Sequence, residues 1–84
     1  MTTSTLELSN KSLSDIAYLI KQDWKNLSIY AKPYVDAMEQ LNSIEDNYYA
    51  DSAQSVVLYF LANAQSWRGD IAREVKAYLK KITK

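Results

Sequence analysis

The chain has 84 residues and no net charge at pH 7, because ten Lys and Arg balance ten Asp and Glu. This length allows one domain with a modest core, and the neutral balance does not imply strong charge-driven binding to DNA or membranes. The absence of Cys and His excludes disulfides, imidazole or thiolate catalysis and the usual zinc sites. We therefore expect no enzymatic activity, no metal and no cofactor.

A single glycine and a single proline leave too few chain breakers for a β-sandwich or barrel, so we predict an all-α fold. Residues 1–10 contain no secretory signal pattern and predict a flexible N-terminal tail on a cytoplasmic protein. Residues 11–84 are expected to form one helical domain. The longest apolar stretch, 56–62, is far shorter than the roughly 20 residues that span a bilayer, so no membrane contact is expected.

The first helix is predicted over residues 13–26, with Ser12 as its cap and Asp15 in its first turn. Its apolar residues recur at helical spacing and mark one face, made of Leu13, Ile16, Ala17, Ile20, Trp24 and Leu27.

The second helix is predicted over 29–41, capped by Ser28 and with Pro33 in its first turn, where the missing N–H costs little. Its expected core face comprises Tyr30, Tyr34, Ala37, Met38 and Leu41. The segment 42–50 that follows is rich in turn-forming Asn, Ser and Asp.

The third helix is predicted over 52–65, with Asp51 as its cap; its apolar run also suits a strand, but no partner strand is recognisable. The fourth is predicted over 67–82. Its start is open, because either Ser66 caps a helix from Trp67, or Gly69 ends the preceding helix and Asp70 caps the next. Four amphipathic segments with short connections predict a compact bundle closed around Trp24, Phe60 and Trp67.

Trp24-Lys25, the run from Tyr59 to Ala64 and the Trp67-Arg68-Gly69 that follows it are the main parts of a pattern that covers about residues 20–81, and Trp67-Arg68-Gly69 is the most specific of them. This pattern resembles small helical proteins encoded in phage and prophage regions. The chain departs from that pattern at Tyr49 and Tyr78, where glycine and glutamate are more usual. The resemblance implies a small intracellular protein without known catalytic residues that acts with a larger partner.

Charge is segregated along the chain, since five acidic residues and no basic one lie between Pro33 and Trp67. Within this acidic part Glu45 and Asp46 stand beside Tyr48 and Tyr49, a residue type that favours binding surfaces. These four residues predict an acidic tyrosine loop that binds protein. The alternative is that one ring packs down as an anchor of the loop.

The third helix is unusual because no charged residue occurs from Ser52 to Trp67, and Tyr59 and Asn63 lie opposite its apolar face. Either this helix is central and covered on all sides, or its polar stripe is an interface. An interface would extend the binding surface of the tyrosine loop onto the helix.

The acidic residues allow two further interpretations, both of which we disfavour. The first is a cation site made of Glu45, Asp46, Asn47 and Asp51, but these residues lack the spacing and glycine of a calcium loop. Asp36 and Glu39 make an i, i+3 carboxylate pair, but on a face where nothing is expected to shift their pKa toward acid–base catalysis.

The C-terminal helix carries a basic strip whose members recur at i, i+3, i+7 and i+11: Arg73, Lys76, Lys80 and Lys84. Such a strip either solvates the outer face and offsets the helix dipole or contacts the phosphates of a nucleic acid. Our leading interpretation is a non-enzymatic interaction protein that binds a protein partner, with nucleic-acid association as the alternative. Both are compatible with a homo-oligomer.

Overall fold

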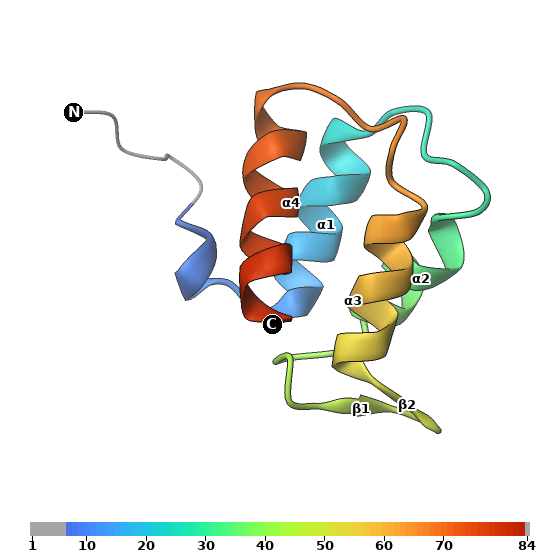
Figure 1. Cartoon of the computed structure of the whole chain (residues 1–84), viewed down its shortest axis with the longest axis vertical. Helices are drawn as coiled ribbons and strands as arrows, with labels where there is room; N and C mark the ends of the chain where they lie inside the picture. Colours follow the sequence, from blue (N-terminus) through green and yellow to red (C-terminus); the bar gives the residue numbers. More distant parts are fainter. Residues whose placement is uncertain (1–6, 84) are drawn as a thin grey trace.

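Four helices and one β-hairpin make up the part of the chain that this computed structural model describes, residues 7–83 (Figure 1). The helices are α1 (Leu13–Asp23), α2 (Lys32–Met38), α3 (Ala53–Ala62) and α4 (Asp70–Ile82), preceded by a single 3₁₀ turn, η1 (Leu8–Asn10). The two strands, β1 (Asn47–Tyr48) and β2 (Asp51–Ser52), pair antiparallel, with Asn47 opposite Ser52 and Tyr48 opposite Asp51.

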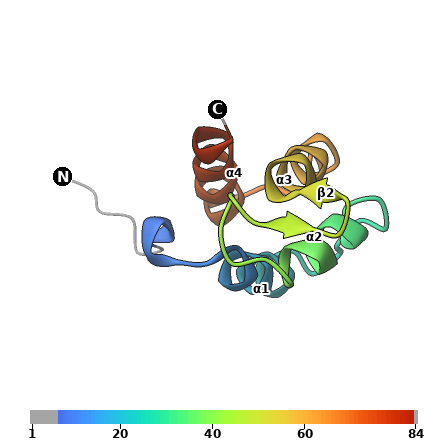
Figure 2. The ribbon, with the colours of Figure 1, turned by 90° about the horizontal axis from the view of Figure 1, so that it is seen from below.

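The helices surround one core. α2 packs against α1 and α3, and α4 packs against the same two helices. Seen from below, the hairpin lies across the end of the bundle at which α3 begins (Figure 2). The prediction of a compact, mostly helical domain is therefore confirmed, whereas the all-α assignment is wrong because the turn-rich segment folds back into this hairpin.

An aromatic cluster occupies the opposite end of α3. The rings of Trp24 and Trp67 stack with centroids 5.8 Å apart, and Phe60 meets both edge-on at 6.5 and 6.3 Å. All three residues are buried, as predicted. The indole N–H of Trp67 donates to Asp23 (2.8 Å), so the ring is held by a polar bond as well as by packing. The backbone carbonyl oxygen of Trp67 accepts from the Lys76 ammonium (2.6 Å).

Both of the first two helices are shorter than predicted. α1 ends at Asp23 because Trp24, its C-cap, leaves the helical conformation. Ser28 does not cap α2; its carbonyl oxygen accepts from the amides of Ala31 and Lys32, and its hydroxyl from that of Tyr30, which forms a turn before the helix.

The predicted core face of α2 is wrong at Tyr30, which is 71% exposed. The face that points inward begins one residue later, at Ala31, and continues with Val35 and Met38, all fully buried. The predicted Ala37, Met38 and Leu41 are buried and Tyr34 packs against the core, so the predicted face is wrong at Tyr30 and lacks Ala31 and Val35. Pro33 lies in the first turn, as predicted.

The ends of α3 and α4 also differ from the prediction. Asp51 does not cap α3, because the helix begins at Ala53 and its N-cap is Ser52, whose hydroxyl accepts from the Ser55 amide (3.1 Å). α4 starts at Asp70, after Gly69, whose φ of 115° is a conformation that a glycine adopts without steric cost. The start at Trp67 is thus wrong, because Trp67 enters the core from the connecting loop.

The N-terminal segment is only partly described. Residues 1–6, most of the expected flexible tail, lie outside the described part of the chain. Leu8, by contrast, belongs to the core cluster and is 8% exposed, so η1 packs on the bundle. None of the described helices combines the length and hydropathy that crossing a bilayer requires.

Candidate functional site

The loop before the hairpin is organised by Asp46. Its carboxylate accepts from the backbone amides of Asn42 (2.8 Å) and Ser43 (3.0 Å), and these bonds lower the pKa of Asp46 below its ordinary value. The carbonyl oxygen of Asp46 accepts from the amide of Ala53 at the start of α3 (2.8 Å). Asp46 was predicted as a binding residue, but its carboxylate serves to close the loop.

The two tyrosines of the hairpin differ in their environment. Tyr48 is half-buried and packs against the core, which agrees with the alternative of a loop anchor. Tyr49 is 90% exposed at the turn between the strands, and its ring meets that of Tyr48 edge-on, with centroids 4.7 Å apart. Tyr49 therefore lies exposed in the turn of the hairpin, which lies below α3 in Figure 1.

The backbone of Tyr49 is in the left-handed region, with φ of 55°. A bulky side chain rarely adopts this conformation, because its Cβ approaches the neighbouring carbonyl oxygen, and glycine is the usual residue there. The hairpin thus keeps a large exposed ring at a position where the local geometry favours glycine.

Two exposed carboxylates lie on or near the hairpin. Asp51 pairs with Tyr48 in β2 and so lies next to the turn that carries Tyr49. Glu45 lies in the turn before β1, at the open end of the hairpin, so the structure does not place it beside Tyr49. Asp51 extends the acidic surface onto the second strand.

The outer face of α3 is exposed and uncharged. Tyr59 is 53% and Leu58 47% exposed, so the expectation of a central helix covered on all sides is wrong. The ring of Tyr59 contacts that of Tyr34 on α2, with centroids 5.6 Å apart. The amide of Asn63 donates to the carbonyl oxygen of Tyr59 (2.9 Å) and so caps the end of α3.

Of the residues that the sequence predicted for protein binding, Tyr49, Glu45 and Tyr59 offer exposed groups, whereas Asp46 and Asn63 are engaged in local hydrogen bonds. Leu58 and Tyr34 adjoin the same region although the sequence pattern does not single them out. The absence of charge along α3 is the signal that points to Leu58, but Tyr34 meets Tyr59 only through the packing of α2 on α3.

The carboxylates of Asp36 and Glu39 are used in ion pairs. The Lys21 ammonium bridges them at 2.7 and 3.1 Å, and Lys32 adds a second contact to Asp36 at 2.8 Å. The hydrogen bond from Lys21 is the main cause that lowers the pKa of Asp36. The two carboxylates therefore connect α2 with α1 through Lys21. Within residues 7–83 no group of three or more acidic residues gathers as metal ligands do.

The predicted basic strip lies on α4. Lys76 and Lys80 contribute to a groove beside this helix, and Arg73 forms an ion pair with Asp70 (2.7 Å) at its edge. Lys84 lies outside the described residues. Arg68, which the periodic strip does not include, joins this group from the loop before α4.

Comparison of the chain with protein-family models, curated proteins and solved structures gives no match. The resemblance to phage-encoded helical proteins therefore stays a prediction, and the functional argument rests on the surfaces described above.

Proposed function

We propose that this chain is a non-enzymatic interaction protein that binds a larger protein partner through the hairpin and the adjoining face of α3. The observation that carries the proposal is Tyr49, a ring that is 90% exposed on a backbone with positive φ. The positive φ is unfavourable for a tyrosine, and residues held in such conformations concentrate at functional sites.

The face of α3 supports the proposal by its composition. Protein interfaces are enriched in tyrosine and depleted in charged residues at their centre, and the exposed Leu58 and Tyr59 lie on a helix without a single charge. Tyr59 lies seven residues after Ser52, about 10 Å along a helix axis, so one partner can reach both it and the hairpin.

The acidic groups define the chemistry of the partner. Asp51, next to the turn, and Glu45, before β1, would lie at the rim of the interface, where opposite charges steer association and set orientation more than they add affinity. We therefore expect a partner whose surface offers an apolar pocket for Tyr49 with basic residues around it. This is an aromatic anchor with a charged rim, the arrangement common at interaction hot spots.

The test uses two variants that each delete one exposed tyrosine ring. Tyr49→Ala removes the proposed anchor, and Tyr18→Ala removes a ring that is 62% exposed on α1, away from the hairpin. All three chains are used to capture proteins from native-host extract. The proteins of interest are those that the wild type and Tyr18→Ala retain and Tyr49→Ala does not. These proteins are purified and titrated against all three chains by calorimetry.

We expect Tyr49→Ala to weaken binding by at least about 30-fold, which corresponds to a hot-spot loss of roughly 2 kcal/mol, and Tyr18→Ala to leave it within about twofold. Leu58→Lys should weaken the same complex. The proposal fails if no purified protein binds the wild type directly, or if Tyr49→Ala binds as tightly as Tyr18→Ala.

A further inference from the structure

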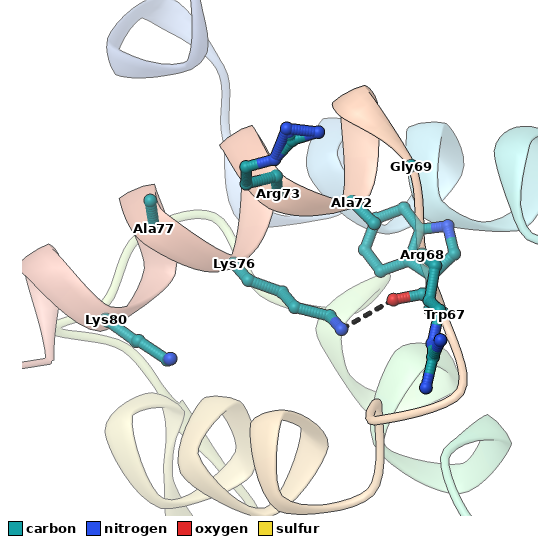
Figure 3. Close-up of a pocket in the computed structure, with 8 residues that line it drawn as sticks. All are labelled: Trp67, Arg68, Gly69, Ala72, Arg73, Lys76, Ala77 and Lys80. Carbon is teal, nitrogen blue, oxygen red and sulfur yellow. Dashed lines mark hydrogen bonds between the residues drawn. The ribbon is translucent and has the colours of Figure 1, made fainter.

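A shallow groove of about 430 Å³ runs beside α4, on a part of the molecule that the proposed protein interface does not use (Figure 3). Four cationic side chains line it, and none of the described lining residues is acidic. We call it the α4 groove, and its lining residues are Trp67, Arg68, Gly69, Ala72, Arg73, Lys76, Ala77 and Lys80.

Three of the cations are brought together by the fold. Lys76 reaches back to the carbonyl oxygen of Trp67, which holds its ammonium beside the loop that carries Arg68 (Figure 3). Burial, together with the charges of Lys80 and Arg68, lowers the pKa of Lys76. The side chains of Arg68 and Lys80 form no hydrogen bond or ion pair with any other residue in 7–83. Like charges held so close repel one another, and a bound anion would offset that repulsion.

A second hollow of about 510 Å³ continues the α4 groove past Arg68. It shares Trp67 and Arg68 with the groove and adds Lys25 from the segment after α1. Asp23 also lines this hollow, but its carboxylate accepts the indole N–H of Trp67. Cationic groups therefore follow a path from the end of α1 along α4.

The lining argues for a phosphate backbone and against a protein segment. Protein interfaces draw most of their affinity from aromatic or apolar anchors, yet the one aromatic residue of the groove, Trp67, is 2% exposed. Gly69, Ala72 and Ala77 leave the floor free of bulky side chains. Contacts to phosphates need only cations and hydrogen-bond donors, which Arg and Lys supply.

We infer that the α4 groove binds the phosphate backbone of a nucleic-acid strand, with Arg68, Lys76 and Lys80 as the contacts and without reading of the base sequence. Because the whole chain is neutral, the attraction is local, and binding is weak and strongly salt-dependent. The affinity for a single strand should fall with salt by a log–log slope of about 0.7 for each phosphate contacted.

The probe is a fluorescein-labelled single-stranded DNA 20-mer of mixed sequence, followed by fluorescence anisotropy between 25 and 200 mM NaCl. The groove variant is Arg68→Gln with Lys80→Gln, which leaves the Lys76–Trp67 bond intact and so preserves the fold. The control is Lys11→Gln with Lys81→Gln, which removes the same charge from exposed residues outside the groove.

We expect the wild type and the control to bind at 25 mM NaCl with a dissociation constant on the order of 10⁻⁵ M. The groove variant should bind at least about tenfold more weakly, with a salt slope smaller by about 1.4. The inference is overturned by no binding at 25 mM NaCl or by equal losses in both variants. It is also overturned if polyglutamate of matched charge competes as well as unlabelled DNA, because the groove would then accept acidic protein segments. The Tyr49→Ala chain should bind the DNA like the wild type, so this test is independent of the hairpin.

Discussion

The aromatic residues at the two ends of α3 differ in how far they are buried. At the C-terminal end Trp24, Phe60 and Trp67 are buried against one another, and the hydrogen bond from the Trp67 indole to Asp23 fixes its ring. At the N-terminal end Tyr49 has one aromatic neighbour, an exposed ring and an unfavourable backbone conformation. Aromatic residues therefore stabilise the core at one end, whereas at the other end the ring of Tyr49 is left in solvent.

The largest expected effect comes from removing an aromatic ring of the buried cluster. Trp67→Ala leaves a cavity against Trp24 and Phe60 and should lower the free energy of unfolding by about 3–5 kcal/mol, a large part of the stability of a domain this small. Guanidinium unfolding followed by far-UV circular dichroism measures the loss. Tyr49→Ala should change it by less than about 1 kcal/mol, and an equal loss in the two variants would contradict the contrast between the two ends.

Asp23→Ala should lower the free energy of unfolding by a smaller amount, because it leaves the buried indole N–H of Trp67 without its acceptor. The cost of such an unsatisfied donor is about 1–3 kcal/mol. Removing the exposed carboxylate of Glu45 by Glu45→Ala is the control and should have little effect. In a Trp67→Phe background the Asp23→Ala effect should largely vanish in the same unfolding experiment, and its persistence would show that Asp23 acts through another contact.

Tyr49→Gly should raise the free energy of unfolding slightly, whereas the two preceding substitutions lower it. Relief of the left-handed conformation is worth about 1–2 kcal/mol, and the greater freedom of glycine in the unfolded chain offsets part of it, so stability should rise by up to about 1 kcal/mol. Thermal unfolding measures this gain. If the variant is less stable than the wild type, the Tyr48–Tyr49 contact outweighs the strain, and the argument from strain to binding is lost.

The smallest expected effect is local and depends on pH. The pKa of Asp46 is lowered in the folded chain, so its bonds to the Asn42 and Ser43 amides stabilise the loop fully above the ordinary value of 3.8. This contribution is lost as the pH falls through the lowered value. NMR titration should show the two amide signals shifting below pH 4 while the ring signals of Phe60 stay unchanged, and Asp46→Asn should remove that dependence. Simultaneous shifts of Phe60 would mean that the hairpin and the core respond together.

The helical class, the amphipathic faces and the aromatic core are predictable because they depend on local spacing. Ser12 caps α1 as predicted, and Trp24, Phe60 and Trp67 form the core. The helix ends are less predictable. Ser28 and Asp51 are residue types that often cap helices, yet Ser28 stabilises a turn before α2 and Asp51 pairs with Tyr48 in the hairpin. The hairpin escapes the sequence pattern because each strand has only two residues and its turn lacks glycine.

For the candidate sites, the sequence by itself determined which residue types are available. These are tyrosines next to acidic residues, a helix without charged residues, and basic residues that recur at helical spacing. Only the tertiary structure decided which of them face solvent. The chain reverses between Tyr48 and Asp51, which pair with each other. Tyr48, in the strand, packs against the core, whereas Tyr49, in the turn, is exposed. Arg68 joins Lys76 and Lys80 because Trp67 enters the core from a loop and brings its neighbour to the side of α4. Periodicity describes one segment at a time, whereas these groupings arise from contacts between segments far apart in the chain.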